Sequence, residues 1–165
     1  MGTNDNLSKE KIMSFQSFEE IVRFAIEKER EAIAFYEDAG NQESYSGAKK
    51  AFKEFANEER KHEALLEKFL KGETNLSQYK FEWIPDIKRS NYIEDMTYEK
   101  GMAYPDILRL AMKREEKALQ LYRDLSEKTD NEELLKVLKL LRQEEAKHKL
   151  ALETLYDDHM AALGD

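Results

Sequence analysis

The stretch that decides the fold is RQEEAKHKLALETLY, residues 142–156. On a helix, Glu145 and His148 lie on one face, because they are three residues apart. Leu141 and Leu152 belong to the same face, and leucines at such spacing point into a hydrophobic core. A glutamate and a histidine would ordinarily remain in water. The pair is therefore either part of a wet helix surface or a polar site inside a core, and the rest of the chain decides between the two.

The composition favours one helical domain. The chain has 165 residues, with only two prolines and six glycines, and it is rich in Glu, Lys, Leu and Ala. The net charge of −8 and the lack of a basic stripe argue against a nucleic-acid partner. Cysteine is absent, which excludes disulfides, thiolate nucleophiles and Cys-ligated metals from this chain and fits a reducing compartment.

The sequence carries no signal for a membrane or for secretion. No apolar run is long enough to span a bilayer. The N-terminus, MGTNDNLSKEK, has no hydrophobic segment of the kind found in signal peptides. We therefore interpret residues 1–17 as a lead-in to the domain, and we expect a cytoplasmic protein without a membrane partner.

Four segments carry apolar residues at the alternating four- and three-residue spacing of a bundle core. The first two are separated by the turn GNQESYSG (40–47), and the last two by the turn SEKTDNE (126–132). Gly72 is a candidate helix stop. The pattern predicts an all-α four-helix bundle over residues 18–162, built from two helical hairpins (18–71 and 104–162).

Residues 72–103 join the two hairpins and are many for a helix–helix loop. A segment of this length can travel along the whole bundle, so we interpret it as a crossover connection. We expect a short helix within residues 90–102. We also expect Phe81, Trp83 and Ile84 to pack on the outside of the bundle.

Each of the four apolar stripes is interrupted by polar residues where the spacing calls for an apolar one. A shift of 86 residues superposes the second hairpin on the first, including these polar positions and the pair Tyr36 and Tyr122. A repeat of two helical hairpins is therefore predicted. The interrupting residues are Glu29, Glu59, His62, Glu115, Glu145 and His148.

The six polar residues are expected to meet in the middle of the bundle. In an antiparallel hairpin, residues equally far from the turn lie at the same height. Glu29 and Glu59 are equally far from the middle of the first turn, and the second hairpin repeats this relation. Each of these glutamates lies about 22 Å along its helix from the loop that joins the hairpin. The histidines lie one helical turn further from that loop. If the hairpins pack around a pseudo-twofold axis, all six side chains converge.

A wet surface is the alternative interpretation, because Glu is common on helix surfaces and Glu-x-x-His alone is a weak pattern. An unpaired buried carboxylate, however, costs several kcal/mol, and four of them would rival a total stability of about 5–15 kcal/mol. No Lys or Arg lies on the same stripes near these residues, and two of the three histidines of the chain fall here. Two divalent cations would balance four carboxylates, so we predict a metal site.

The arrangement matches the ferritin-like di-iron pattern. In that pattern, two helices each supply one Glu, and the other two helices each supply a Glu-x-x-His pair. The stretches EREAIAFYEDAG (29–40) and ANEERKHEALL (56–66) resemble the rubrerythrin branch of the ferritin-like superfamily. The resemblance covers residues 18–71 and 104–157. It implies two irons about 3.5–4 Å apart, although oxygen and imidazole ligands also suit Mn and are compatible with Zn. By the same resemblance, Glu59 and Glu145 are bridging ligands, and the other ligands are Glu29, Glu115, His62 and His148.

The chain departs from relatives of this kind at three points. Rubrerythrin carries a rubredoxin domain with cysteines, whereas this chain has none, so the resemblance implies a separate electron donor such as a rubredoxin. The extra glutamate of rubrerythrin, one turn after the third-helix ligand, is Ala118 here, which removes the basis for a redox-linked iron shift. The haem-binding methionine of bacterioferritin is Arg60 here, so we predict no haem.

Residues around the predicted site allow two interpretations each. The hydroxyls of Tyr36 and Tyr122 could bond a ligating carboxylate or supply a proton, or these could be core aromatics with a satisfied hydroxyl. Glu58 and Glu144 could each accept a hydrogen bond from the histidine of the other hairpin, or be surface residues. We interpret His159 as a helix-end residue and not as a ligand.

The resemblance implies a non-haem di-iron oxidoreductase that reduces hydrogen peroxide to water with electrons from the separate donor, in a role against oxidative stress. We expect a homodimer. Two other functions remain open. One is a ferroxidase or iron-sequestering protein that uses O2 and forms a large hollow oligomer. The other is a metal-stabilised interaction module without turnover.

Overall fold

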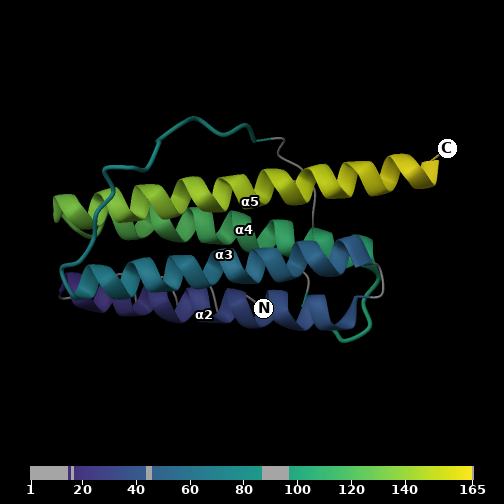
Figure 1. The fold of residues 1–165 in the computed structure, drawn as a ribbon, viewed down its shortest axis with the longest axis horizontal. Coiled ribbons are helices and arrows are strands. Elements are labelled where there is room, and N and C mark those ends of the chain that lie inside the picture. Colours follow the sequence, from purple (N-terminus) through teal and green to yellow (C-terminus); the bar gives the residue numbers. More distant parts are fainter. Residues whose placement is uncertain (1–14, 16, 44–45, 87–96, 165) are drawn as a thin grey trace.

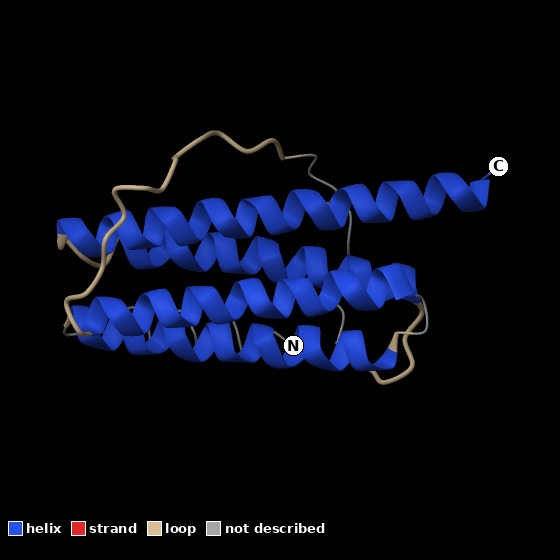
Figure 2. Cartoon of the chain, viewed as in Figure 1, coloured by secondary structure: helices blue, strands red, loops and turns tan. Residues whose placement is uncertain are grey.

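The computed structural model describes residues 15, 17–43, 46–86 and 97–164, and these form four helices without any strand (Figures 1 and 2). The helices pack side by side as an elongated bundle, which confirms the predicted all-α four-helix fold. None of the helices described is long and apolar enough to cross a membrane. The first hairpin consists of α2 (Phe18–Gln42) and α3 (Ser46–Leu70), and the second of α4 (Tyr104–Ser126) and α5 (Glu132–Gly164).

The helix ends follow local capping rules. The Ser17 hydroxyl accepts a hydrogen bond from the backbone N–H of Glu20 (3.3 Å) at the start of α2, and a proline occupies the first turn of α4. At the end of α3, the N–H of Gly72 donates to Phe69 O and the N–H of Glu73 donates to Lys68 O, each at 3.0 Å. This is a Schellman motif, and Gly72 adopts the left-handed φ of +71° that it requires. Gly72 therefore terminates α3, as the sequence predicts.

The hydrophobic core is divided into two clusters along the bundle. One cluster contains Ile21, Leu66 and Leu138, and the other contains Phe52 and Leu152. Both clusters draw residues from all four helices, so each closes one end of the bundle. Along each helix, the polar residues that interrupt the stripe lie between the residues of one cluster and those of the other. A buried polar layer therefore separates two apolar layers, as the interrupted stripes predict.

Residues 71–86 of the connection leave the end of α3 and pass over the outside of α5, and residues 97–103 lie at the opposite end of the bundle, where α4 begins (Figure 1). Gln143 holds it on α5: its Oε1 accepts a hydrogen bond from the backbone N–H of Glu82 (2.8 Å), and its Nε2 donates to Lys80 O (3.0 Å). Further along, the ammonium of Lys149, which is buried, lies 2.5 Å from a carboxylate oxygen of Asp86.

One expectation for this connection needs correction, and another lies partly outside the described residues. Trp83 does not pack on the bundle, because 83% of its surface is exposed. Phe81 does contact its surroundings, since its ring packs edge-on against Tyr79 and lies under the ammonium of Lys139. Of the helix expected within residues 90–102, residues 90–96 lie outside the described part, and residues 97–102 form no helix.

Two glycine substitutions should change stability in opposite directions. Gly72→Ala forces a side chain into a left-handed backbone and should lower the free energy of unfolding by about 1 kcal/mol. Gly47→Ala, in the first turn of α3, should raise it by about 0.5 kcal/mol through helix propensity. An added Cβ meets no atom within 4 Å at either site, so clashes do not contribute. Urea unfolding of both variants measures the difference, and equal shifts would contradict the assigned helix end.

Candidate metal centre

The six polar residues of the interrupted stripes are all buried in the centre of the bundle. Each is at most 6% exposed, although glutamate and histidine are polar or charged. The helices supply them in a repeated order: one Glu from α2 and one from α4, and a Glu-x-x-His pair from α3 and from α5. The sequence repeat is thus reproduced in space, and the structure brings together all six residues predicted to share one site.

The six residues form two overlapping groups in which one ligand atom per residue lies within 4.8 Å of the others. Glu59 and Glu145 belong to both groups, whereas each remaining residue belongs to one. Two neighbouring cations bridged by two carboxylates would need two residues common to both groups, as is found here. The first group is Glu29, Glu59, His62 and Glu145, and the second is Glu59, Glu115, Glu145 and His148.

Both histidines turn Nδ1 toward the carboxylates. Nδ1 of His62 lies 2.9 Å from Oε1 of Glu145, and Nδ1 of His148 lies 2.7 Å from Oε1 of Glu59. Each histidine therefore approaches the glutamate of the other hairpin that belongs to both groups. The two imidazole rings are stacked with their centroids 5.6 Å apart, so the two groups are adjacent.

Several atoms of the cluster have no hydrogen-bond partner among the described residues, although they are buried. Nδ1 of His148 and Oε1 of Glu59 make no hydrogen bond even though they are only 2.7 Å apart. Oε2 of Glu29 and Oε2 of Glu115 are also unpartnered. Buried lone pairs that approach one another without hydrogen bonds are costly unless a cation accepts them. The oxygen and imidazole donors therefore fit divalent metal ions.

The electrostatics of the cluster show how its charge is balanced by protons. Burial raises the pKa of Glu29 to about 8, and hydrogen bonding to Glu59 and its negative charge add to the shift. Burial, with the charges of Glu115 and Glu59, raises the pKa of Glu145 well above its usual range. Burial alone would lower the pKa of both histidines, but the neighbouring glutamates raise it well above its usual range. Metal binding must therefore displace protons from these groups.

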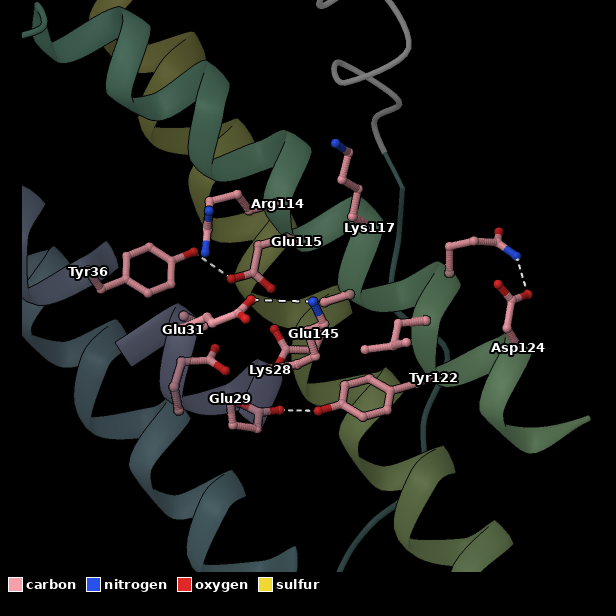
Figure 3. Close-up of a pocket in the computed structure, with 15 residues that line it drawn as sticks. Lys28, Glu29, Glu31, Tyr36, Arg114, Glu115, Lys117, Tyr122, Asp124 and Glu145 are labelled. Atoms are coloured by element: carbon pink, nitrogen blue, oxygen red, sulfur yellow. Dashed lines mark hydrogen bonds and ion pairs between the residues drawn. The ribbon is translucent and has the colours of Figure 1, made fainter. Parts of the chain in front are cut away.

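The two tyrosines connect the hairpins crosswise (Figure 3). The hydroxyl of Tyr36 on α2 donates to Oε1 of Glu115 on α4 at 2.5 Å, and the hydroxyl of Tyr122 on α4 donates to Oε1 of Glu29 on α2. Both tyrosines are buried. Sequence reasoning considered such bonds but did not predict the crossing. The crossing follows because two helical turns, about 10 Å, separate each tyrosine from the glutamate on its own helix.

Of the two interpretations of Glu58 and Glu144, the structure supports that of surface residues. Nε2 of His62 has no hydrogen-bond partner in the described part of the chain, so Glu144 does not accept a hydrogen bond from it. The carboxylates of Glu58 and Glu144 instead lie beside lysines one turn along their own helices, at 2.9 and 3.6 Å. These i,i+3 lysines satisfy the glutamates locally. His159 packs against the ring of Tyr104, away from the cluster, as expected of a helix-end residue.

A cavity of about 410 Å³ connects the cluster with the surface between α2 and α4 (Figure 3). All four buried glutamates line its inner part, and Ala32 and Ala118 line the gap between the two helices. Neither histidine is among the lining residues. The sequence analysis did not predict this cavity, although the repeated alanines, one turn after the α2 and α4 glutamates, were a signal for it. The surrounding rim carries Lys28, Glu31, Arg114, Lys117 and Asp124.

With the fold and the site described, comparison with known proteins gives the family. The ferritin-like domain family model matches residues 18–157. The chain therefore belongs to the ferritin-like domain family, which is the class that the bundle and its buried Glu/His cluster indicate. No curated protein matches the chain.

Two solved structures share the architecture. One is a hypothetical protein from Pyrococcus furiosus, with 27% sequence identity and a TM-score of 0.63 over 88% of this chain and 93% of that protein. The other, from Thermotoga maritima, is described as a candidate ferritin-like diiron-carboxylate protein, with 23% identity and a TM-score of 0.64 over 87% of this chain and 97% of that protein. The second likeness supports the fold, and the buried cluster in this chain indicates a di-metal site.

Removal of one crossing hydroxyl should destabilise the bundle. Tyr36→Phe leaves a buried carboxylate oxygen of Glu115 without its donor, so we expect the free energy of unfolding to fall by about 1–3 kcal/mol. Tyr98→Phe is the matched control, because the Tyr98 hydroxyl has no partner among the described residues. The control should change stability by less than about 0.5 kcal/mol. Chemical unfolding compares the two variants, and equal effects would contradict the role of the crossing bond.

Proposed function

We propose that the cluster holds two metal ions, with Glu59 and Glu145 bridging them. The overlapping groups support this assignment, because these two glutamates are the residues that both groups share. Each ion would also have its own glutamate and its own histidine. The proposed ligands of one ion are therefore Glu29 and His62, and those of the other are Glu115 and His148, in addition to the bridging pair.

The function that we propose is that of a non-haem di-iron oxidoreductase, similar to rubrerythrin, that reduces hydrogen peroxide. When bound, two ferrous ions supply the two electrons that, with two protons, convert one peroxide into two water molecules. The chain has no cysteine for an internal relay. A separate protein, such as a rubredoxin, would therefore return the electrons.

The side chains around the ions have distinct tasks in this proposal. The two apolar clusters limit access of water from the ends of the bundle, which strengthens electrostatic interactions inside. Tyr36 and Tyr122 fix the orientation of the terminal carboxylates and keep a proton beside each of them. The cavity between α2 and α4 gives a small oxidant a route to the bridging glutamates.

The ligand assignment predicts the metal content of two neighbouring variants. Glu59→Gln should lose at least one of the two bound ions, because it removes a carboxylate that both groups share. Glu58→Gln should retain two ions, because that carboxylate pairs with Lys61 at the surface. Elemental analysis of both purified variants counts the ions per chain. Unchanged content in Glu59→Gln would show that the ligand set is wrong.

The proposed reaction predicts a preference for the oxidant. Stopped-flow absorbance of the di-ferrous protein should show oxidation by hydrogen peroxide at least tenfold faster than by O2 at equal concentration, a difference of about 1.4 kcal/mol in activation free energy. Glu58→Gln should behave like the unchanged protein, since its carboxylate pairs with a surface lysine.

Other outcomes would identify the alternatives. Faster oxidation by O2 together with a large hollow oligomer in size-exclusion chromatography would indicate a ferroxidase. Bound zinc only, with no redox activity after iron loading, would indicate a metal-stabilised module. Either result would contradict peroxide reduction.

A further inference from the structure

The cavity beside the cluster is much larger than its proposed oxidant requires. Its volume is about 410 Å³, whereas a water molecule occupies roughly 30 Å³ in the liquid and hydrogen peroxide has only one more oxygen atom. Cavities between about 300 and 1,000 Å³ are typical of sites for small organic ligands. Between the buried carboxylates and the rim, its walls include the apolar side chains of Ala32, Ala118 and Leu121. The cavity therefore has both the size and the apolar wall of an organic binding site.

The rim breaks the symmetry that the inner part of the cavity obeys. The 86-residue repeat superposes Ala118 on Ala32 but places Lys117 where the first hairpin has Glu31. On the α2 side, Lys28 lies 3.4 Å from the carboxylate of Glu31, so its charge is neutralised locally. On the α4 side, Arg114 occupies the position equivalent to Lys28, and no acid stands at the equivalent of Glu31. Arg114 therefore has no acid at the position that neutralises Lys28, although Asp124 also lies on the α4 side of the rim.

Arg114 is held in place but makes no ion pair with the described residues. Its guanidinium lies over the ring of Phe35, 4.5 Å from the ring centroid, and the side chain is half-buried. Arg114 lines the cavity together with Tyr36, the residue next to Phe35. In Figure 3 its side chain extends toward the side of the cavity where Tyr36 lies, whereas the ammonium of Lys117 points away from the buried carboxylates. A stacked guanidinium whose donors have no acceptor among the described residues is suited to a carboxylate.

We infer that the cavity binds a small aliphatic monocarboxylate, whose carboxylate pairs with Arg114 and whose chain lies along Ala32, Ala118 and Leu121. The inference rests on the cavity and its rim and goes beyond the proposed peroxide chemistry. It requires no redox step. The buried glutamates line the inner part of the cavity, so the far end of such a chain would lie near them.

Isothermal titration calorimetry with acetate, butanoate, hexanoate and octanoate tests this inference on zinc-loaded protein at constant ionic strength, so that no oxidation interferes. The affinity should rise about threefold to fourfold for each added CH2 until the cavity is filled. Octanamide, which lacks the charge, should bind at least tenfold more weakly than octanoate. Affinity that does not depend on chain length would overturn the inference, because it would indicate anion binding at the surface.

Variants separate the charge from the apolar wall. Arg114→Gln should weaken octanoate binding about tenfold or more. Arg123→Gln, an exposed arginine on the same helix and outside the cavity, should leave binding unchanged. Ala118→Leu should weaken octanoate binding but not acetate binding, since it fills the space for the chain. Unchanged octanoate affinity in Arg114→Gln would overturn the inference even if Ala118→Leu does not fold.

The outcomes distinguish this inference from the proposed function. Rapid peroxide oxidation of the di-ferrous protein without carboxylate binding would contradict only the ligand inference. Carboxylate binding that follows chain length, without any peroxide reaction, would leave the ligand inference intact and contradict the proposed function.

Discussion

The constraint on which the rest of the structure depends is the burial of four carboxylates and two imidazoles within one layer of the bundle. Ionised carboxylates in a low-dielectric interior cost several kcal/mol each unless opposite charge accompanies them. Among the described residues, the four buried glutamates form ion pairs with His62 and His148 and none with lysine or arginine, so those cations do not supply the opposite charge. Protons or metal ions must supply it. The pKa values of Glu29 and Glu145 are raised because burial without opposite charge favours the protonated carboxyl group.

The same layer explains why the two hairpins belong together. Neither hairpin contains a complete ligand group, because the first group needs Glu145 and the second needs Glu59. The tyrosines repeat this dependence, since Tyr36 and Tyr122 each donate to a glutamate of the other hairpin. The apolar clusters above and below the layer also take residues from both hairpins. The site is therefore complete only when the two hairpins pack together.

The sequence predicts those features that follow from the regular spacing of residues along a helix. Helical spacing placed the six polar residues on core stripes, and equal distance from the turns placed them at one height. The crosswise partners of Tyr36 and Tyr122 could not be derived in this way, because helix spacing relates residues within one helix and not across two. The same limit applies to Gln143, whose role depends on where the connection between the hairpins passes. Trp83 was expected to pack because it is apolar, yet composition does not say which residues of a connection face the bundle.

The two faces of the centre are built differently, and this difference follows from side-chain size. On the α2–α4 face, alanines one turn after the glutamates leave a gap that opens to the surface. On the α3–α5 face, the residues one turn after Glu59 and Glu145 are His62 and His148, whose rings are stacked, and the cavity is not lined by them. A molecule therefore approaches the carboxylates from the alanine side. The inner walls of that approach repeat between the hairpins, whereas its rim does not, since Glu31 on one side corresponds to Lys117 on the other. If the cavity discriminates between ligands, the difference arises at the rim, because the rim residues differ between the two hairpins. The glutamates and alanines further in are the same in both hairpins.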